Sequence, residues 1–157
     1  MHIGTSSKKL DITSEIKTKE VSEKFSNYLK KGDIVYLYGD IGTGKTTFVK
    51  YLINYLQKKN NEKIIEILSP TFNILNEYEI NDLKVLHYDL YRIKDQNELV
   101  NLGLITEQKE SLIFIEWPNL INTNSKKTIN LNFKYEDNFN KRSLTIKSNN
   151  SKIINGL

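Results

Sequence analysis

The chain has 157 residues and a mass of 18.3 kDa, which suits a single compact domain. With 38% hydrophobic residues, a net charge of +4 and no cysteine, the composition excludes a disordered chain, disulfides, thiol catalysis and cysteine-based zinc sites. No apolar run approaches the roughly 20 residues of a membrane-spanning helix, and Met1–Lys9 lacks the apolar stretch of a signal peptide, so we expect a cytoplasmic protein.

Apolar periodicity predicts helices and strands that alternate along the chain. Helices are predicted over residues 18–31, 46–59 and 95–102. Strands are predicted over residues 34–38, 63–68, 72–80, 84–91, 112–115, 128–135 and 143–147, with a hairpin turn at Asn81-Asp82. Residues 122–127 and 136–142 are expected to be loops, and the tail over 148–157 is expected to fray. The layout predicts one α/β domain over residues 1–157, with a mixed sheet covered by helices.

The segment after the predicted strand 34–38 fits the phosphate-binding pattern G-x-x-x-x-G-K-[ST] at every fixed position. It reads Gly39-Asp40-Ile41-Gly42-Thr43-Gly44-Lys45-Thr46. Glycines let the backbone curl so that several amide groups point at phosphate oxygens, and the following helix adds its positive end. In this pattern Lys45 reaches the β- and γ-phosphates and Thr46 holds Mg²⁺. The alternative is a glycine-rich turn that only joins a strand to a helix.

Two acidic residues follow predicted strands. Glu116 follows the apolar run 112–115, and Asp89 follows residues 85–88. Nucleotide hydrolysis needs an acid near the metal, and the carboxyl ends of parallel strands lie beside a phosphate loop. Glu116 is the better candidate to hold Mg²⁺ through water or to orient the attacking water, because its strand is uniformly apolar. The alternative for each acid is an ordinary carboxylate at a strand end.

Two absences narrow the class of nucleotide enzyme. The guanine-reading motif N-K-x-D does not occur, since Asn140-Lys141 continues as Arg142-Ser143, and this argues against a GTPase. A small-molecule kinase usually closes an arginine-bearing lid over the phosphates, and this chain has only Arg92 and Arg142. A kinase stays open as an alternative to an ATPase. So does a nucleotide-gated binding module in which hydrolysis is incidental.

Further motifs resemble the TsaE (YjeE) family, the small bacterial ATPases required for threonylcarbamoyladenosine modification of tRNA at position 37. Besides the phosphate loop, the resemblance rests on Ser69-Pro70-Thr71-Phe72, Asn76-Glu77-Tyr78, His87-Tyr88-Asp89-Leu90-Tyr91-Arg92 and Glu116-Trp117-Pro118. These motifs have the family's order and spacing, and the match spans about residues 14–142. The family is similar in fold to other P-loop NTPases, which implies a mainly parallel sheet with flanking antiparallel strands.

The resemblance also implies roles for the matched residues. Those that would bind ATP are Thr18, Gly39, Asp40, Ile41, Gly42, Thr43, Gly44, Lys45, Thr46, Thr47, Trp117 and Arg142. Thr46 and Glu116 would be the Mg²⁺ residues, and Glu116, Asp89 and Lys45 the catalytic ones. Two segments would sense the nucleotide, one with Ser69, Pro70, Thr71 and Phe72 and the other with His87, Asp89 and Arg92. For Thr18 a helix N-cap hydroxyl is an equal alternative, and for His87 a purely structural role is preferred.

The family resemblance implies partners as well. The ATPase would act in a complex with TsaD, which transfers the threonylcarbamoyl group, and with TsaB, and ATP hydrolysis would reset that complex between turnovers. Two arginines offer few groups to neutralise γ-phosphate charge, and a missing arginine finger costs about 10³–10⁵ in rate. We therefore expect slow hydrolysis by the isolated protein. The many lysines have two interpretations. A solvated lysine surface is preferred, and weak contact with tRNA is the alternative.

Overall fold

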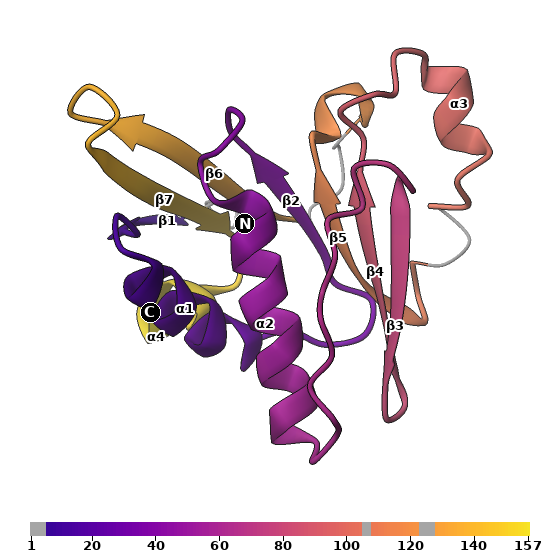
Figure 1. Ribbon diagram of the computed structural model, residues 1–157, viewed down its shortest axis with the longest axis horizontal. Coiled ribbons are helices and arrows are strands. Elements are labelled where there is room, and N and C mark those ends of the chain that lie inside the picture. Colours follow the sequence, from indigo (N-terminus) through magenta and orange to yellow (C-terminus); the bar gives the residue numbers. More distant parts are fainter. Residues whose placement is uncertain (1–5, 105–107, 123–127) are drawn as a thin grey trace, which may run out of the picture.

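The computed structural model describes residues 6–104, 108–122 and 128–157. Its elements in chain order are β1 (Ser6–Asp11), α1 (Glu15–Ser26), β2 (Ile34–Tyr38), α2 (Lys45–Lys59), β3 (Leu75–Ile80), β4 (Leu83–Asp89), α3 (Gln96–Val100), β5 (Ser111–Glu116), the 3₁₀ helix η1 (Pro118–Leu120), β6 (Thr128–Glu136), β7 (Lys141–Ser148) and α4 (Ser151–Gly156). The strands form one sheet against which the helices pack (Figure 1).

The sheet is mixed and has the strand order β1-β7-β6-β2-β5-β4-β3. Its four middle strands are parallel, because β2 pairs in parallel with β6 and β5, and β5 pairs in parallel with β4. The outer strands β3, β7 and β1 pair antiparallel with their neighbours. These pairings confirm the predicted α/β class with a mainly parallel sheet and flanking antiparallel strands.

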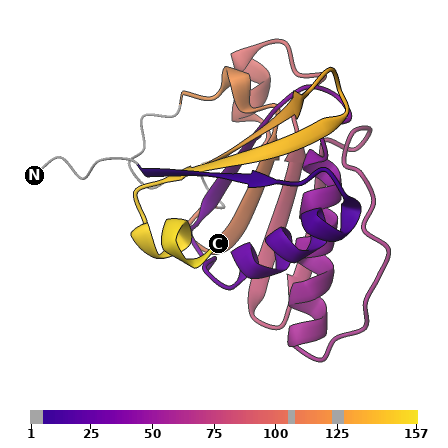
Figure 2. The same cartoon turned by 90° about the vertical axis from the view of Figure 1, so that its left-hand side faces the viewer.

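Helices cover both faces of this sheet. Helices α1, α2 and α4 pack on one face, where Phe25, Phe48 and Ile153 are buried. The segment with α3 and η1 lies on the other face, where Leu99 and Leu120 pack against the strands (Figure 2). The strands in the middle are therefore apolar on both sides, and every residue of β5 is buried.

The long helices match their predictions except at their ends. Helix α1 begins at Glu15, before the predicted Thr18, because the Ser14 side chain caps it by accepting a hydrogen bond from the Lys17 amide over 3.2 Å. It ends at Ser26, and the predicted remainder of the helix forms turns that lead to β2. Helix α2 begins at Lys45, and the short predicted helix near Asp95 is confirmed as α3.

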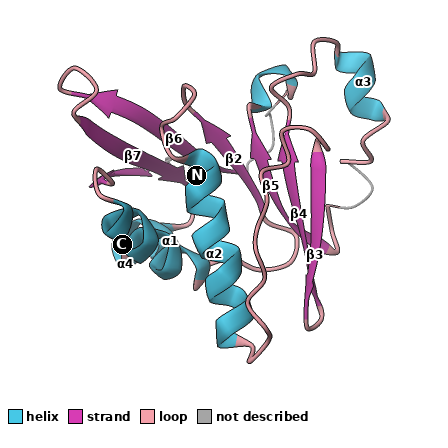
Figure 3. Cartoon of the chain, in the orientation of Figure 1, coloured by secondary structure: helices cyan, strands magenta, loops and turns pink. Residues whose placement is uncertain are grey.

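The prediction of a strand over residues 63–68 is wrong. This segment is loop, and it runs from the end of α2 back toward β3 (Figure 3). Of its apolar residues only Ile67 is buried, while Ile64, Ile65 and Leu68 are exposed, and no described strand pairs with it. The strand predicted over 72–80 begins only at Leu75, because residues 70–74 form a turn in which the Ile74 amide donates to the Pro70 carbonyl.

The tail predicted to fray is ordered, which corrects the expectation for residues 148–157. The Asn150 side chain caps α4 by accepting from the Lys152 amide over 3.0 Å, and Ile153 is 1% exposed in the core. Strand β1 is not predicted either, because its sequence is polar and its order comes from pairing with β7.

The remaining predictions concern hairpins and loops. The antiparallel pair of β6 and β7 is confirmed, although its strands extend into the predicted loop 136–142 and leave only residues 137–140 as the turn. The hairpin turn at Asn81-Asp82 is also confirmed. Of the predicted loop 122–127, residues 123–127 lie outside the described residues. Among the described residues, no helix has the length and apolar character needed to cross a membrane.

Candidate nucleotide and metal site

The loop between β2 and α2 curls so tightly that two of its positions favour glycine. At Gly39 φ is 144°, and a Cβ atom would lie 2.5 Å from the carbonyl oxygen of Phe133 on β6. At Gly42 φ is 79°, and a Cβ atom would lie 2.6 Å from the Tyr135 hydroxyl. Both conformations favour glycine. A loop of this kind can turn several backbone amides toward one anion.

Internal hydrogen bonds hold the loop in this shape. Thr43 is 1% exposed, and its hydroxyl donates to the Asp40 carbonyl over 2.7 Å. From β6, the Tyr135 hydroxyl donates to the Ile41 carbonyl over 3.3 Å. Helix α2 begins directly after the loop, at the same edge of the sheet as the carboxyl ends of β2, β4 and β5 (Figure 1). Its first-turn amides and the positive end of its dipole therefore lie at the loop.

The Lys45 side chain is folded back over the loop. It is 4% exposed, and Nζ donates hydrogen bonds to the carbonyl oxygens of Gly39 over 2.7 Å and Asp40 over 2.9 Å. Nζ also lies 4.4 Å from the centre of the Trp117 ring. Burial lowers the pKa of Lys45, and the negative charge of Glu116 is the main influence that opposes this shift. The ammonium group is thus held by carbonyl oxygens whose place phosphate oxygens can take.

Thr46 and Glu116 meet at the start of α2. The Thr46 hydroxyl lies 2.8 Å from Oε1 and 3.0 Å from Oε2 of Glu116, and donates to this carboxylate. Glu116 ends β5 and is 2% exposed. On its other side, Nε2 of His87 lies 2.8 Å from Oε1. The structure therefore brings together the two residues predicted to hold Mg²⁺, and it adds His87 as a third member of the cluster.

Asp89 lies next to this cluster. It is the register partner of Glu116 on the parallel strand β4, and it is 5% exposed. One carboxylate oxygen accepts from the Thr71 hydroxyl over 2.9 Å, and the other accepts from the Tyr91 amide over 3.0 Å. The Ser69 and Thr71 hydroxyls are themselves 2.7 Å apart. The two segments predicted to sense the nucleotide are thus joined by a direct hydrogen bond.

Trp117 forms one wall of the site. Its backbone is in the left-handed region, with φ 57° and ψ 55°, between the end of β5 and η1. The ring lies over the Lys45 ammonium group, and its centre is 4.9 Å from that of the Tyr91 ring. The left-handed turn directs the chain from β5 into η1 at the edge of the site.

Other predicted residues are not brought into this cluster. The Thr18 hydroxyl donates to the Ile12 and Ser14 carbonyls, so its predicted N-cap alternative is wrong, because Ser14 holds that position. Arg142 lies on β7 opposite Tyr135, two strands from β2. Arg92 donates to the Phe72 carbonyl over 2.6 Å and lies over the exposed Phe72 ring.

Two other predicted residues flank the cluster. Thr47 is half-buried in the first turn of α2, and Pro70 is buried beside Thr71 in the turn before β3. Among the described residues, no hydrogen bond joins the Thr47 side chain to the cluster, and the Pro70 side chain has no hydrogen-bonding group. Their predicted parts in nucleotide binding and sensing stay predictions.

Sequence reasoning missed two features of the site. Local sequence patterns do not point to Tyr135, because its contact with the loop depends on β6 lying next to β2. The contact of His87 with Glu116 depends on the register of β4 against β5. In each case the signal is a long-range pairing that no local pattern carries.

The donors present suit a magnesium ion shared with phosphate groups. Among the described residues no three histidine, cysteine or acidic side chains converge as a metal cage. Mg²⁺ usually keeps several waters and binds one or two carboxylates together with substrate phosphates. The oxygen donors of Thr46 and Glu116, with Asp89 beside them, fit that pattern. The described part of the chain assembles no cluster of nitrogen ligands and thiolates of the kind that favours transition metals.

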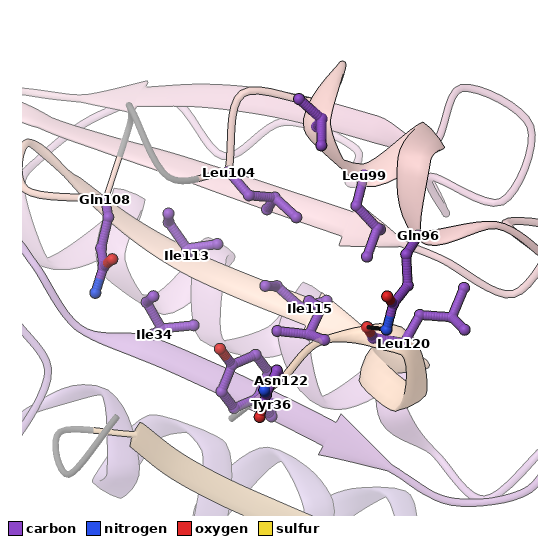
Figure 4. A pocket seen from close by; sticks show the side chains of 12 residues that line it. Ile34, Tyr36, Gln96, Leu99, Leu104, Gln108, Ile113, Ile115, Leu120 and Asn122 are labelled. Carbon is purple, nitrogen blue, oxygen red and sulfur yellow. Dashed lines mark hydrogen bonds between the residues drawn. The ribbon is translucent and has the colours of Figure 1, made fainter. Parts of the chain in front are cut away.

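A cavity of about 400 Å³ lies on the face of the sheet that is opposite to α2. Figure 4 shows its walls, which include Ile34 and Tyr36 from β2, Ile113 and Ile115 from β5, and Leu99 from α3. The side chains that line it carry no charge. A polyphosphate needs compensating charge or backbone donors, so this cavity does not suit one.

Comparisons with known proteins find similarity over most of the chain. The sequence model of the family described as "Threonylcarbamoyl adenosine biosynthesis protein TsaE" matches residues 12–144. The tRNA threonylcarbamoyladenosine biosynthesis protein TsaE of Rickettsia typhi is 40% identical over 140 residues, which cover 88% of this chain and 94% of that protein. The protein of the same name from Aquifex aeolicus is 36% identical over 110 residues, 70% of this chain and 76% of that protein.

A solved structure shares the fold. The crystal structure of Bacillus subtilis YdiB superposes with a TM-score of 0.74 and covers 96% of this chain and 91% of that chain, at 24% sequence identity.

Proposed function

Because the chain belongs to the TsaE family of threonylcarbamoyladenosine biosynthesis proteins, we propose that it binds ATP and Mg²⁺ at the loop before α2 and hydrolyses ATP. Hydrolysis is slow in the isolated protein and faster with partners, and it serves the threonylcarbamoyladenosine modification of tRNA. The hydrogen bond between Thr46 and Glu116 carries this proposal. It joins the hydroxyl that follows the loop lysine to a buried carboxylate on the neighbouring strand, as a nucleotide–metal site requires.

Each residue of the site has a defined task in this proposal. The loop amides and Lys45 bind the phosphates, while Thr46 and Glu116 hold the metal, directly or through water. When bound, Mg²⁺ supplies positive charge that offsets the negative charge on the terminal phosphates. Glu116 would also orient the attacking water, and the hydrogen bond from Thr71 to Asp89 would hold the loop that senses the terminal phosphate. Trp117 shields the Lys45 side of the site from solvent.

The two arginines support a dependence on partners. The Arg92 guanidinium donates to the Phe72 carbonyl, and Arg142 lies on β7, two strands from β2. Among the described residues, neither arginine side chain has a hydrogen bond to the loop, and an arginine finger is worth about 10³–10⁵ in rate. A partner that supplies positive charge, or that moves Arg92, would raise the rate. We propose that TsaD-like and TsaB-like proteins are these partners and that they, rather than this chain, make the main contacts with tRNA.

The proposal is tested in cells that lack the native gene and carry one of three variants. Lys45→Ala and Glu116→Ala are expected to abolish threonylcarbamoyladenosine in tRNA, measured by nucleoside analysis. Lys58→Ala, an exposed lysine on the same helix, is expected to leave it unchanged. Normal levels of the nucleoside in the first two variants would contradict the proposal. Loss in Lys45→Ala alone would favour a nucleotide-gated binding module instead.

The enzymatic part is tested with purified components. ATP turnover by the isolated protein is expected to be slow and to rise when TsaD-like and TsaB-like proteins are added. Fast turnover that partners do not change would contradict the partner dependence.

A further inference from the structure

His87 is fully buried, and its ring makes one polar contact with the described residues. It lies on β4, its exposed fraction is 0%, and Nε2 is 2.8 Å from Oε1 of Glu116. Nδ1 has no hydrogen-bond partner among the described residues. Buried polar atoms are nearly always paired, because an unpaired one costs free energy. If this residue only filled space, an apolar side chain would do so at a lower cost in free energy. The ring is therefore accounted for by its contact with Glu116 and not by packing alone.

The chemistry of the contact fixes its direction. A carboxylate oxygen only accepts hydrogen bonds, so Nε2 must carry the proton and donate. The Thr46 hydroxyl lies close to both oxygens of Glu116, at 2.8 and 3.0 Å, and does not distinguish them. His87 bonds to Oε1 alone. It is therefore the contact that sets the rotation of the carboxylate about its last bond.

We propose that His87 is a positioning residue that holds the Glu116 carboxylate in one orientation for Mg²⁺. The inference rests on the proposed function, since it concerns the same metal site. It assigns His87 a task that neither a structural histidine nor a nucleotide-sensing segment has. Partners that hydrogen-bond to metal ligands typically change metal affinity 10–100-fold when they are removed.

The test uses a matched pair of variants and the only tryptophan of the chain, Trp117, as the reporter. Methionine and glutamine have nearly the same size and shape, but only glutamine can donate to Glu116. Mg²⁺ is titrated into the ADP-bound protein while Trp117 fluorescence is recorded. His87→Met is expected to raise the half-saturating Mg²⁺ concentration by about tenfold or more, and His87→Gln by about threefold at most. Binding of ADP without Mg²⁺ is expected to be unchanged in both.

The same substitution made in the Glu116→Ala protein distinguishes a positioning role of His87 from a packing role. If His87 acts through Glu116, then His87→Met causes no further shift in the half-saturating Mg²⁺ concentration when Glu116→Ala is already present. Equal shifts in the methionine and glutamine variants would overturn the inference. So would a methionine effect that persists in the Glu116→Ala protein.

A further measurement leaves His87 and Glu116 unaltered, so it needs no substitution within the site. In ¹⁵N-histidine NMR spectra only His2 and His87 contribute, and His2→Gln identifies the signals of His87. The proton of His87 is expected on Nε2, and a proton on Nδ1 alone would overturn the inference. A wild-type protein that does not respond to ADP at all would overturn the proposed function and this inference together. A normal ADP response with a proton on Nδ1 alone would overturn only the inference.

Discussion

The Thr71 hydroxyl donates a hydrogen bond to a carboxylate oxygen of Asp89 over 2.9 Å, which joins the turn before β3 to the end of β4. Asp89 is in turn the register partner of Glu116. Thr71 is therefore hydrogen-bonded to the residue of β4 that lies beside the proposed metal acid in the sheet. This arrangement holds the loop around Ser69–Phe72 next to the strand ends that carry the two acids.

Replacing Thr71 with valine removes the hydroxyl and keeps the shape of the side chain. We expect Thr71→Val to weaken binding of a non-hydrolysable ATP analogue by about tenfold relative to ADP, because a hydrogen bond to a charged group is lost. Thr71→Ser keeps the hydroxyl and should retain the wild-type ratio. Calorimetric titration with both nucleotides gives this ratio, and an unchanged ratio in the valine variant would exclude a sensing role for Thr71.

The glycines of the loop differ in what surrounds them, and this predicts different costs of substitution. A Cβ atom at Gly39 meets a backbone carbonyl oxygen at 2.5 Å, whereas at Gly44 it meets nothing within 4 Å. Gly44→Ala should lower the free energy of unfolding by about 1 kcal/mol, through backbone conformation alone. Gly39→Ala should lower it by roughly 3 kcal/mol or more, because packing strain is added. Urea denaturation measures both, and equal losses would contradict the contact with β6.

We expect the carboxylate of Glu136 to make the stability of the protein depend on pH in the acid range. Its carboxylate pairs with Lys9 at 2.9 Å and accepts from the Ser143 hydroxyl, and the hydrogen bond from Lys9 is the main cause that lowers the pKa of Glu136. A lowered pKa stabilises the folded protein above the unfolded value of 4.5, and this stability is lost as the pH falls through the folded value. Glu136→Gln should therefore flatten the pH dependence of the thermal midpoint below about pH 5.

The partner of this carboxylate supplies an independent check. Lys9→Met should flatten the same part of the curve, because the pair is broken from its other side. If either variant kept the wild-type pH profile, the ion pair between β1 and β6 would make no contribution to stability in solution.

The C-terminal helix should contribute to stability through one side chain. Ile153 is 1% exposed, whereas Asn155 on the same helix is exposed. Ile153→Ala is expected to lower the free energy of unfolding by about 2–4 kcal/mol, and Asn155→Ala by about 0.5 kcal/mol at most. Thermal or urea unfolding distinguishes them. A small and equal effect of both would mean that the tail frays, as its sequence predicts.

The parts of this molecule that are predictable from sequence are those with local causes. The apolar run of β2 and the glycine pattern after it lie next to each other in the chain, so the strand, the loop and α2 follow from a short stretch of residues. The same holds for β5 and for Glu116 at its end. Their placement in parallel beside each other follows from the α/β alternation.

The remaining parts depend on residues far apart in the sequence. Strand β1 is polar and becomes a strand only because β7 offers it an antiparallel edge. Residues 63–68 have strand-like composition but no neighbour to pair with among the described strands. The contact of His87 with Glu116 requires the register between β4 and β5, which sequence patterns do not fix.

Calorimetric titration of the purified protein with ADP and Mg²⁺ tests the central claim most directly, namely that the loop holding Lys45 binds a nucleotide. We predict uptake of the nucleotide by the wild type and by Lys58→Ala. Lys45→Ala should bind at least about 100-fold more weakly, because a buried charge pair with phosphate is lost. No heat of binding to the wild type, or equal affinity in the two lysine variants, would contradict the account.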